Sequence, residues 1–213
     1  MAKYSKATFG QISGTVNNAV GSSWRGVNYL RDIAKKNSKG PSPDQLGVQA
    51  KMVLAAKYLA RIRAVLNIGF ADKKLNKITA YNAAVKEFIN HAVVGEYPDL
   101  SVDYANMKVS KGSLTGLKSV TMTLDGNLLK LQWQNKLDKV LGNADDEVLV
   151  LLYNSTADDY MTNTSAFRND GELTVELEEK VDSTFEVWLF CVSKDRKVTS
   201  TSQYLGNVQF ATV

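Results

Sequence analysis

The chain has 213 residues, of which 44% are hydrophobic and 23% are charged, with three prolines and one cysteine. This composition suits a globular protein with a real core, and it excludes wholesale disorder and an internal disulfide framework. Charge is divided unevenly, because residues 1–90 hold 15 Lys and Arg against 4 Asp and Glu, whereas residues 91–213 hold 11 against 18. A basic half and an acidic half predict either a polyanionic partner or head-to-tail packing of copies.

Glycines punctuate short β-type pieces in the first part of the chain, with a turn expected near Asn17-Asn18. Residues 1–41 therefore predict an extended β-arm or hairpin followed by a basic linker. Such a segment buries little within itself and must lie on the rest of the protein or on a neighbour. Trp24 and Tyr29 are its candidate assembly contacts.

Residues 42–98 predict a two-helix segment. Ser42 is the expected N-cap of the first helix, with Pro43 at its first position and Gln45 completing a capping box. Apolar residues at helical spacing extend this helix to about Asn67, and a second helix is expected from about Lys77 to Val94, before Gly95.

Residues 99–213 have the pattern of strands separated by polar turns. Strands are expected at 128–134, 147–153, 173–177 and 185–192, with a last strand within 201–211. The fold class predicted for the whole chain is α+β, with an N-terminal β-arm, two helices and a C-terminal β-sandwich.

Two resemblances accompany these patterns. Residues 119–211 resemble a fibronectin type III or immunoglobulin-like sandwich through the segments LKLQWQ, EVLVLLYN, ELTVEL, TFEVWLFCVS and YLGNVQF, with Trp133 at the place of the early-strand tryptophan. The whole chain resembles an uncharacterised family of small proteins from Bacteroidota and their phages through GQISGTVNNAVGSSWRGVNYLR, LNIGF, the stretch from YNAAV to YPDLSVDY, and VSKGSLTG. That resemblance implies a domain order and no activity.

The strands at 147–153 and 185–192 are apolar on both faces. If Phe185, Val187, Leu189 and Cys191 face the sandwich core, then Trp188 and Phe190 face outward. A soluble monomer rarely leaves such a patch uncovered. Either the chain's own helices cover it, or the arm or another subunit does, in which case Trp188 and Phe190 are assembly contacts.

Groups that perform catalysis are scarce. One histidine, His91, and one cysteine, Cys191, are too few for a Ser-His-Asp site or a closed zinc site, and the sequence lacks a phosphate-binding glycine motif. The acidic residues at 145–147 and 158–159 lack the ligand spacing of an EF-hand. We therefore expect no enzyme activity, cofactor, metal or small-molecule substrate.

A basic population surrounds the helices and could contact nucleic acid through its backbone, without sequence recognition. The alternatives are a solvated surface or pairing with acidic residues of a neighbour. The candidate contacts are Lys35, Lys36, Lys39, Lys51, Lys57, Arg61, Arg63, Lys73, Lys74 and Lys77.

The sequence thus favours a non-enzymatic structural subunit that self-assembles into a homo-oligomer, such as a phage capsid or tail component. The alternative is an immunoglobulin-like binding module that recognises a protein or glycan through residues 154–170, with Tyr153, Tyr160 and Phe167. Without an apolar segment near the N-terminus or a membrane span, we expect cytoplasmic synthesis without a signal peptide, and a final place in a virion.

Overall fold

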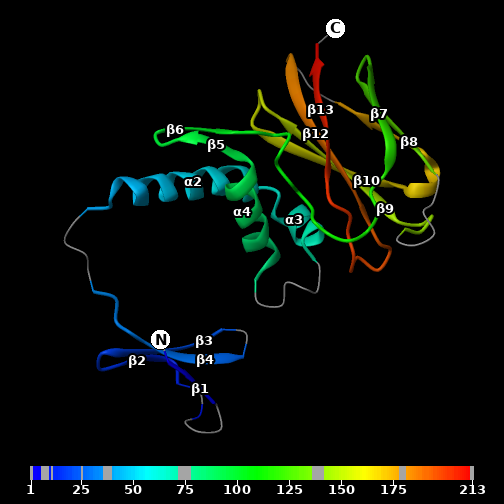
Figure 1. The fold of residues 1–213 in the computed structure, drawn as a ribbon. Helices are drawn as coiled ribbons and strands as arrows, with labels where there is room; N and C mark the ends of the chain where they lie inside the picture. Colours follow the sequence, from blue (N-terminus) through cyan, green and yellow to red (C-terminus); the bar gives the residue numbers. More distant parts are fainter. Residues whose placement is uncertain are drawn as a thin grey trace. The chain divides into compact units, whose positions relative to one another are not determined.

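A computed structural model describes residues 2–5, 10, 12–24, 26–35, 40–71, 78–135, 142–177 and 181–211. The chain divides into two compact units, Met1–Ser42 and Pro43–Val213, each of which is described by itself (Figure 1). The mixture of helices with antiparallel sheets confirms the α+β class.

The first unit is a four-stranded antiparallel sheet in the order β1-β4-β3-β2. Its strands are β1 (Ala2–Tyr4), β2 (Gly14–Val16), β3 (Ala19–Trp24) and β4 (Val27–Asp32). Asn17 adopts a positive φ of 51° between the paired residues Val16 and Ala19, as a two-residue hairpin turn requires. The predicted turn at Asn17-Asn18 is therefore confirmed.

The second unit begins with helices. The first predicted helix, from Pro43 after the Ser42 cap to about Asn67, is wrong in one respect, because it is divided into α2 (Pro43–Leu59) and α3 (Arg63–Gly69). At Ile62 the backbone lies at φ −95° and ψ 19°, outside helical geometry, and this break lets α3 change direction.

The next helix, α4 (Ala80–His91), starts behind Thr79, whose side chain accepts a hydrogen bond from the Asn82 backbone N–H at 3.1 Å. It ends three residues before the predicted Val94. Its successor is a hairpin of β5 (Val93–Glu96) and β6 (Asp99–Val102), which the sequence analysis missed.

Two larger antiparallel sheets follow in the described part of this unit. One has the order β11-β8-β7, from β7 (Lys118–Asp125), β8 (Leu128–Gln134) and β11 (Glu172–Glu176). The other has the order β10-β9-β12-β13, from β9 (Glu147–Asn154), β10 (Asp159–Phe167), β12 (Ser183–Val192) and β13 (Gln203–Phe210). The five predicted strands are confirmed with small shifts at their ends, whereas β7 and β10 were not assigned.

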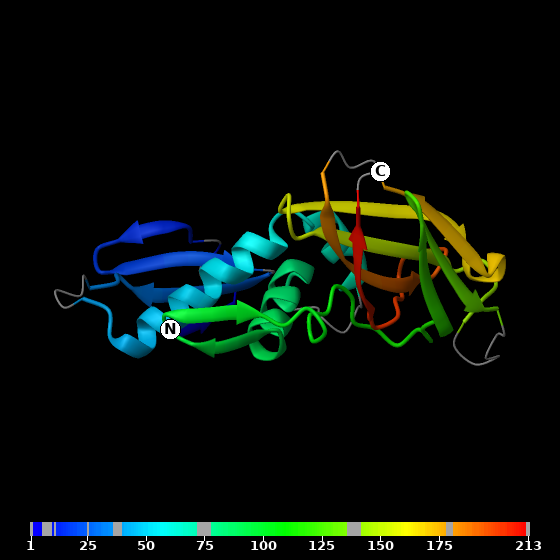
Figure 2. The same ribbon diagram turned by 90° about the horizontal axis from the view of Figure 1, so that it is seen from above.

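The four-stranded sheet β10-β9-β12-β13 separates two hydrophobic cores. One face packs against the three-stranded sheet, and the other packs beneath α2, α3 and α4. In both ribbon views the helices and the strands β7 and β8 lie on opposite sides of this sheet (Figures 1 and 2). Each aliphatic or aromatic side chain buried in these cores contributes about 1.5–3 kcal/mol to folding.

The two-faced pattern predicted for β12 is confirmed residue by residue. Phe185, Val187, Leu189 and Cys191 belong to the core between the sheets, while Trp188, Phe190 and Val192 belong to the core beneath the helices. None of the helices that the structure describes is both long and apolar enough to cross a membrane.

Candidate interaction surfaces

Strand register sorts the side chains of the N-terminal sheet onto two faces. Trp24 pairs with Val27, Tyr29 with Ser22 and Lys3, and Val20 with Arg31 and Thr15. Cross-strand partners share a face, and successive pairs alternate. One face, here named the tryptophan face, therefore presents the apolar side chains of Val20, Trp24, Val27 and Tyr29, flanked by Lys3 and Arg31.

Much of this tryptophan face is accessible. Trp24 is 54% exposed and Val27 is 46% exposed, while Val20 and Tyr29 are half-buried. The predicted contacts Trp24 and Tyr29 thus lie on one surface. Val20 and Val27, which the sequence analysis did not select, join them because of the β3–β4 register.

The opposite face of the sheet is partly covered by its own chain. The Tyr4 hydroxyl accepts a hydrogen bond from the Ile12 backbone N–H at 3.0 Å, and Ile12 approaches Gly21 so closely that a Cβ there would lie 2.7 Å from its side chain. Gly21 is therefore required for this close approach.

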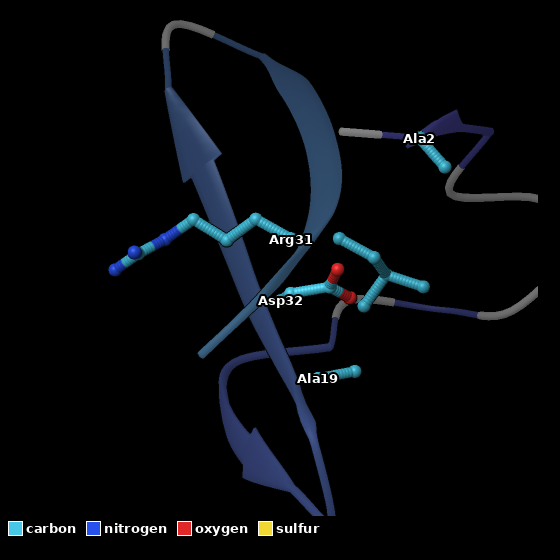
Figure 3. A pocket seen from close by; sticks show the side chains of 5 residues that line it. Ala2, Ala19, Arg31 and Asp32 are labelled. Carbon is cyan, nitrogen blue, oxygen red and sulfur yellow. The ribbon is translucent and has the colours of Figure 1, made fainter. Parts of the chain in front are cut away.

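A shallow hollow of about 250 Å³ remains on the same side. Figure 3 shows the side chains of Ala2, Ala19 and Asp32 on this side of the sheet, whereas Arg31 points away from them. The hollow is small, and the side chains that face it are those of Ala2, Ala19, Leu30 and Asp32, so it offers little chemistry for recognising a ligand.

The N-terminal sheet lacks the hydrophobic support that the other sheets have. Neither hydrophobic core includes any described residue from 2 to 35, and Gly21 and Asn28 are the buried residues in that range. Small sheets need a packed hydrophobic face for stability. Trp24 and Val27 of the tryptophan face are the large exposed apolar side chains of β3 and β4.

The hypothesis that Trp188 and Phe190 are assembly contacts is corrected by their burial. They are 0% and 1% exposed and share a core with Leu59 of α2, Leu66 of α3 and Phe88 of α4. The Trp188 indole N–H donates to the Tyr104 carbonyl at 3.3 Å. Of the two alternatives for this sheet face, the chain's own helices cover it, so it offers no surface to a second copy.

A cluster of tyrosines packs between the helices and this sheet. The hydroxyls of Tyr58 and Tyr104 lie 3.2 Å apart, and the Tyr153 hydroxyl donates to the Asp158 carboxylate at 2.9 Å. The Tyr153 and Tyr160 rings lie 4.7 Å apart, centroid to centroid. Burial raises the pKa of Tyr104, Tyr153 and Tyr160 well above the usual tyrosine value, so all three stay neutral phenols that serve packing.

Three described basic residues on and between the helices α2 and α3 have partners in the same unit. The charged groups of Lys57 and Arg61 lie 4.0 and 3.5 Å from the Asp158 carboxylate, between β9 and β10. Arg63 stacks over the Tyr81 ring at 4.6 Å. The contacts of Lys57 and Arg61 with Asp158 pair the basic half with the acidic half inside one chain.

Two further candidate basic residues belong to the described part of the chain. Lys35 is exposed beyond β4, and Lys51 lies on α2. Outside the described residues lie Lys36, Lys39, Lys73, Lys74 and Lys77. The prediction of a nucleic-acid surface stays a prediction.

A groove runs between the first half of α2 and the β5–β6 hairpin, with a volume of about 440 Å³. Gly47 forms its floor, since a Cβ there would lie 3.7 Å from the Tyr97 Cβ. Val48 and Lys51 line the helix side, and Glu96 and Tyr97 line the hairpin side. We name this the α2–hairpin groove. Sequence analysis missed it because the second helix was extended to about Val94, across the start of β5 (Val93–Glu96).

The surroundings of Cys191 and His91 show whether either side chain is placed for chemistry. Cys191 is fully buried, and burial raises the pKa of its thiol to about 11, so it is a core residue as predicted. The His91 side chain is 57% exposed, 3.8 Å from Glu87. Among the described residues, no group of three or more His, Cys, Asp or Glu side chains is placed to hold a metal ion.

The segment expected to be a recognition loop is corrected by β10. Residues 159–167 form a strand, Tyr153 is only 3% exposed, and Tyr160 packs against the helix core. Phe167 is 47% exposed at the end of β10. The binding-module alternative therefore loses the loop on which it depended.

The fold defines a mixed α+β protein. The family model described as "Family of unknown function (DUF6266)" matches residues 11–206, so the chain belongs to that family. None of the curated proteins matches the sequence.

One solved structure, titled "Myokine structure", is similar to part of this chain. It covers 47% of this chain and 98% of its own, with 16% sequence identity and a TM-score of 0.32. A TM-score of this size supports no argument about fold or function.

Proposed function

We propose that this protein is a non-enzymatic structural subunit that assembles with copies of itself through the tryptophan face of its N-terminal sheet. The observation that carries the proposal is the sheet's lack of hydrophobic support within its own unit, together with the exposure of Trp24 and Val27 at 54% and 46%. Aromatic side chains at such places are typical of interface anchors.

The division of the chain suits this role. Unit Pro43–Val213 contains both hydrophobic cores and supplies a rigid body, whereas unit Met1–Ser42 supplies the connector. One small contact surface gives weak binding, but repetition over many copies gives strong assembly through effective concentration. The setting we propose is a phage virion or virion-like particle, on the basis of the resemblance described above.

We also propose that the two facing sheets are a fibronectin- or immunoglobulin-like sandwich. Seven antiparallel strands divide three to four, with the first, second and fifth strands in one sheet and the others in the second. This division and the crossing between sheets are typical of such sandwiches. A crystal structure with a different strand order would contradict this assignment.

Deletion of residues 1–42 tests the structural function. We expect the full chain to form large species whose size falls as salt rises, and the truncated protein to be a folded monomer, because unit Pro43–Val213 keeps both cores. Size-exclusion chromatography with light scattering at several salt concentrations measures the mass, and circular dichroism checks the fold. A full chain that is monomeric at every salt concentration would refute self-assembly.

A matched pair of point variants tests the face itself. Trp24→Asp places a charge on the tryptophan face and should abolish assembly, whereas Ser23→Asp, its neighbour on the opposite face, should leave assembly unchanged. Equal loss in both variants would indicate damage to the sheet and not removal of a contact.

A further inference from the structure

Helix α2 exposes apolar side chains that its own unit, Pro43–Val213, does not cover. Ala55 and Leu59 are buried against the rest of the unit, yet Val48, Met52 and Val53 are 63%, 49% and 70% exposed. Gln49 and Lys57 are exposed beside them, so the exposed side of α2 mixes apolar and polar groups. Large exposed apolar side chains grouped within a polar surround are typical of a surface that a further protein covers.

The β5–β6 hairpin extends this apolar surface beyond the helix. Tyr97 is 50% exposed and Val94 is 42% exposed, and Tyr97 forms one wall of the α2–hairpin groove opposite Val48. The groove thus has apolar walls from Pro43, Val48 and Tyr97, charged groups from Asp44, Lys51 and Glu96, and a volume of about 440 Å³ that can receive a large side chain.

Charge at the groove is complementary to charge on the tryptophan face. Glu96 and Asp99 are paired across the hairpin end and are both exposed, and Asp44 also lines the groove. These three carboxylates outnumber the Lys51 amino group on the helix side, so the groove is acidic on balance. Lys3 and Arg31 flank the apolar residues of the tryptophan face. The neighbouring Asp32 lies on the opposite face of the sheet, so its carboxylate does not offset these two positive charges. Opposite charges around two apolar patches orient an encounter between them.

We propose that the α2–hairpin groove of one copy receives the tryptophan face of a second copy. The proposal rests on the proposed self-assembly and names its receiving surface. Trp24 and Val27 lie against Val48 and Tyr97, while Lys3 and Arg31 lie near Glu96 and Asp99. Because the two surfaces differ, the contact is head-to-tail, and it generates a ring when the rotation between copies closes and a filament when it does not.

A mixing experiment with two full-length variants tests this pairing. Trp24→Asp disrupts the tryptophan face and keeps the groove. The double variant Val48→Asp with Tyr97→Ser disrupts the groove and keeps the tryptophan face. Each variant alone should be a monomer. Their mixture should form a 1:1 heterodimer and nothing larger, because only one productive pair of surfaces remains. Light scattering and analytical ultracentrifugation measure the masses.

The outcomes separate this inference from the proposed function. If the groove variant still assembles like the unchanged protein while Trp24→Asp does not, self-assembly stands and the groove is not its receiving site. If both variants are monomers and the mixture stays monomeric, the head-to-tail pairing is overturned. If the unchanged protein is itself a monomer, both proposals fail, and docking of the face within one chain takes their place.

A charge exchange provides a second test that does not depend on apolar substitutions. Glu96→Lys should weaken assembly up to about fivefold, the effect expected of one exposed ion pair, and Arg31→Glu should weaken it similarly. Each charge variant is made in a protein whose other surface, the tryptophan face or the groove, is inactivated by the substitutions of the mixing experiment. An equimolar mixture of the two proteins should recover the lost affinity. Failure to recover it would contradict the proposed orientation of the two surfaces. Both residues are exposed, so the substitutions leave the cores intact.

Discussion

At the scale of single residues, Arg168 and Asp146 form a buried ion pair that joins several loops. The Arg168 guanidinium donates to the Asp146 carboxylate at 3.2 Å and also to the carbonyls of Thr115 and Gly116. The two side chains are 6% and 0% exposed. Such a pair adds little net stability compared with apolar residues, but removing one partner leaves the other charge buried.

We expect Arg168→Leu to lower the free energy of unfolding by about 3–5 kcal/mol, because the Asp146 carboxylate loses its counter-charge. Urea denaturation measures the change. The control is Lys194→Ala, which breaks an exposed ion pair to the neighbouring Asp145 and should cost less than about 1 kcal/mol. Similar losses in both variants would show that the buried pair has no special role.

Cys191 gives a prediction about chemical reactivity and pH. Because burial raises its pKa to about 11, the thiol should be protonated and slow to react with a disulfide reagent at pH 8, and should react quickly in urea. A pKa that is higher in the folded protein than its ordinary value of 9.0 adds stability below pH 9, and that stability is lost as pH rises towards 11. Cys191→Ala should therefore reduce the decline in stability over this range. A fast reaction in the native protein would contradict the burial.

At the scale of elements, the hydrophobic periodicity of the sequence was most informative where one face of a strand is buried and the other faces solvent. Strand β8, which alternates between core and solvent, was predicted with its exact bounds. Strand β10 was missed because its residues, DYMTNTSAF, are mostly polar, although they pair along β9. The break between α2 and α3 could not be foreseen, since Ala60–Arg61–Ile62 contains neither proline nor glycine.

Adjacent residues on β12 should report on different layers of the molecule. Trp188→Ala removes a side chain beneath the helices, and Leu189→Ala removes one between the sheets, so each should cost about 2–5 kcal/mol. Hydrogen exchange distinguishes them, because only Trp188→Ala should speed exchange in α2, α3 and α4 more than in β8. The same exchange pattern in both variants would show that the two cores respond as one.

At the scale of the whole molecule, the division of charge along the sequence is partly neutralised inside the chain. Lys57 and Arg61 face Asp158, and the Lys111 amino group lies 2.9 Å from the Glu87 carboxylate. The sequence could indicate the imbalance but not the pairing, because these partners are far apart along the chain. The same limit applied to β9 and β12, whose two apolar faces were predictable while the identity of the covering element was not.

Binding of nucleic acid is a separate prediction for the basic residues outside these pairs, such as Lys35 and Lys51. If these residues contact phosphates, affinity for a labelled single-stranded oligonucleotide should fall about linearly with salt on logarithmic axes. Fluorescence anisotropy at several salt concentrations gives the slope. Lys35→Ala and Lys51→Ala should each reduce its magnitude by about one. A slope near zero would remove nucleic acid from the set of partners.

The strands β9 and β12 have one further consequence. Since they belong to both hydrophobic cores, the helices and the two sheets cannot be inherited, shuffled or expressed as separate modules without uncovering Trp188 and Phe190. A fragment that starts at residue 99 would expose these apolar side chains to water, so it would aggregate or bind a chaperone. Natural recombination within this lineage should therefore exchange the first 42 residues freely and leave the remainder intact.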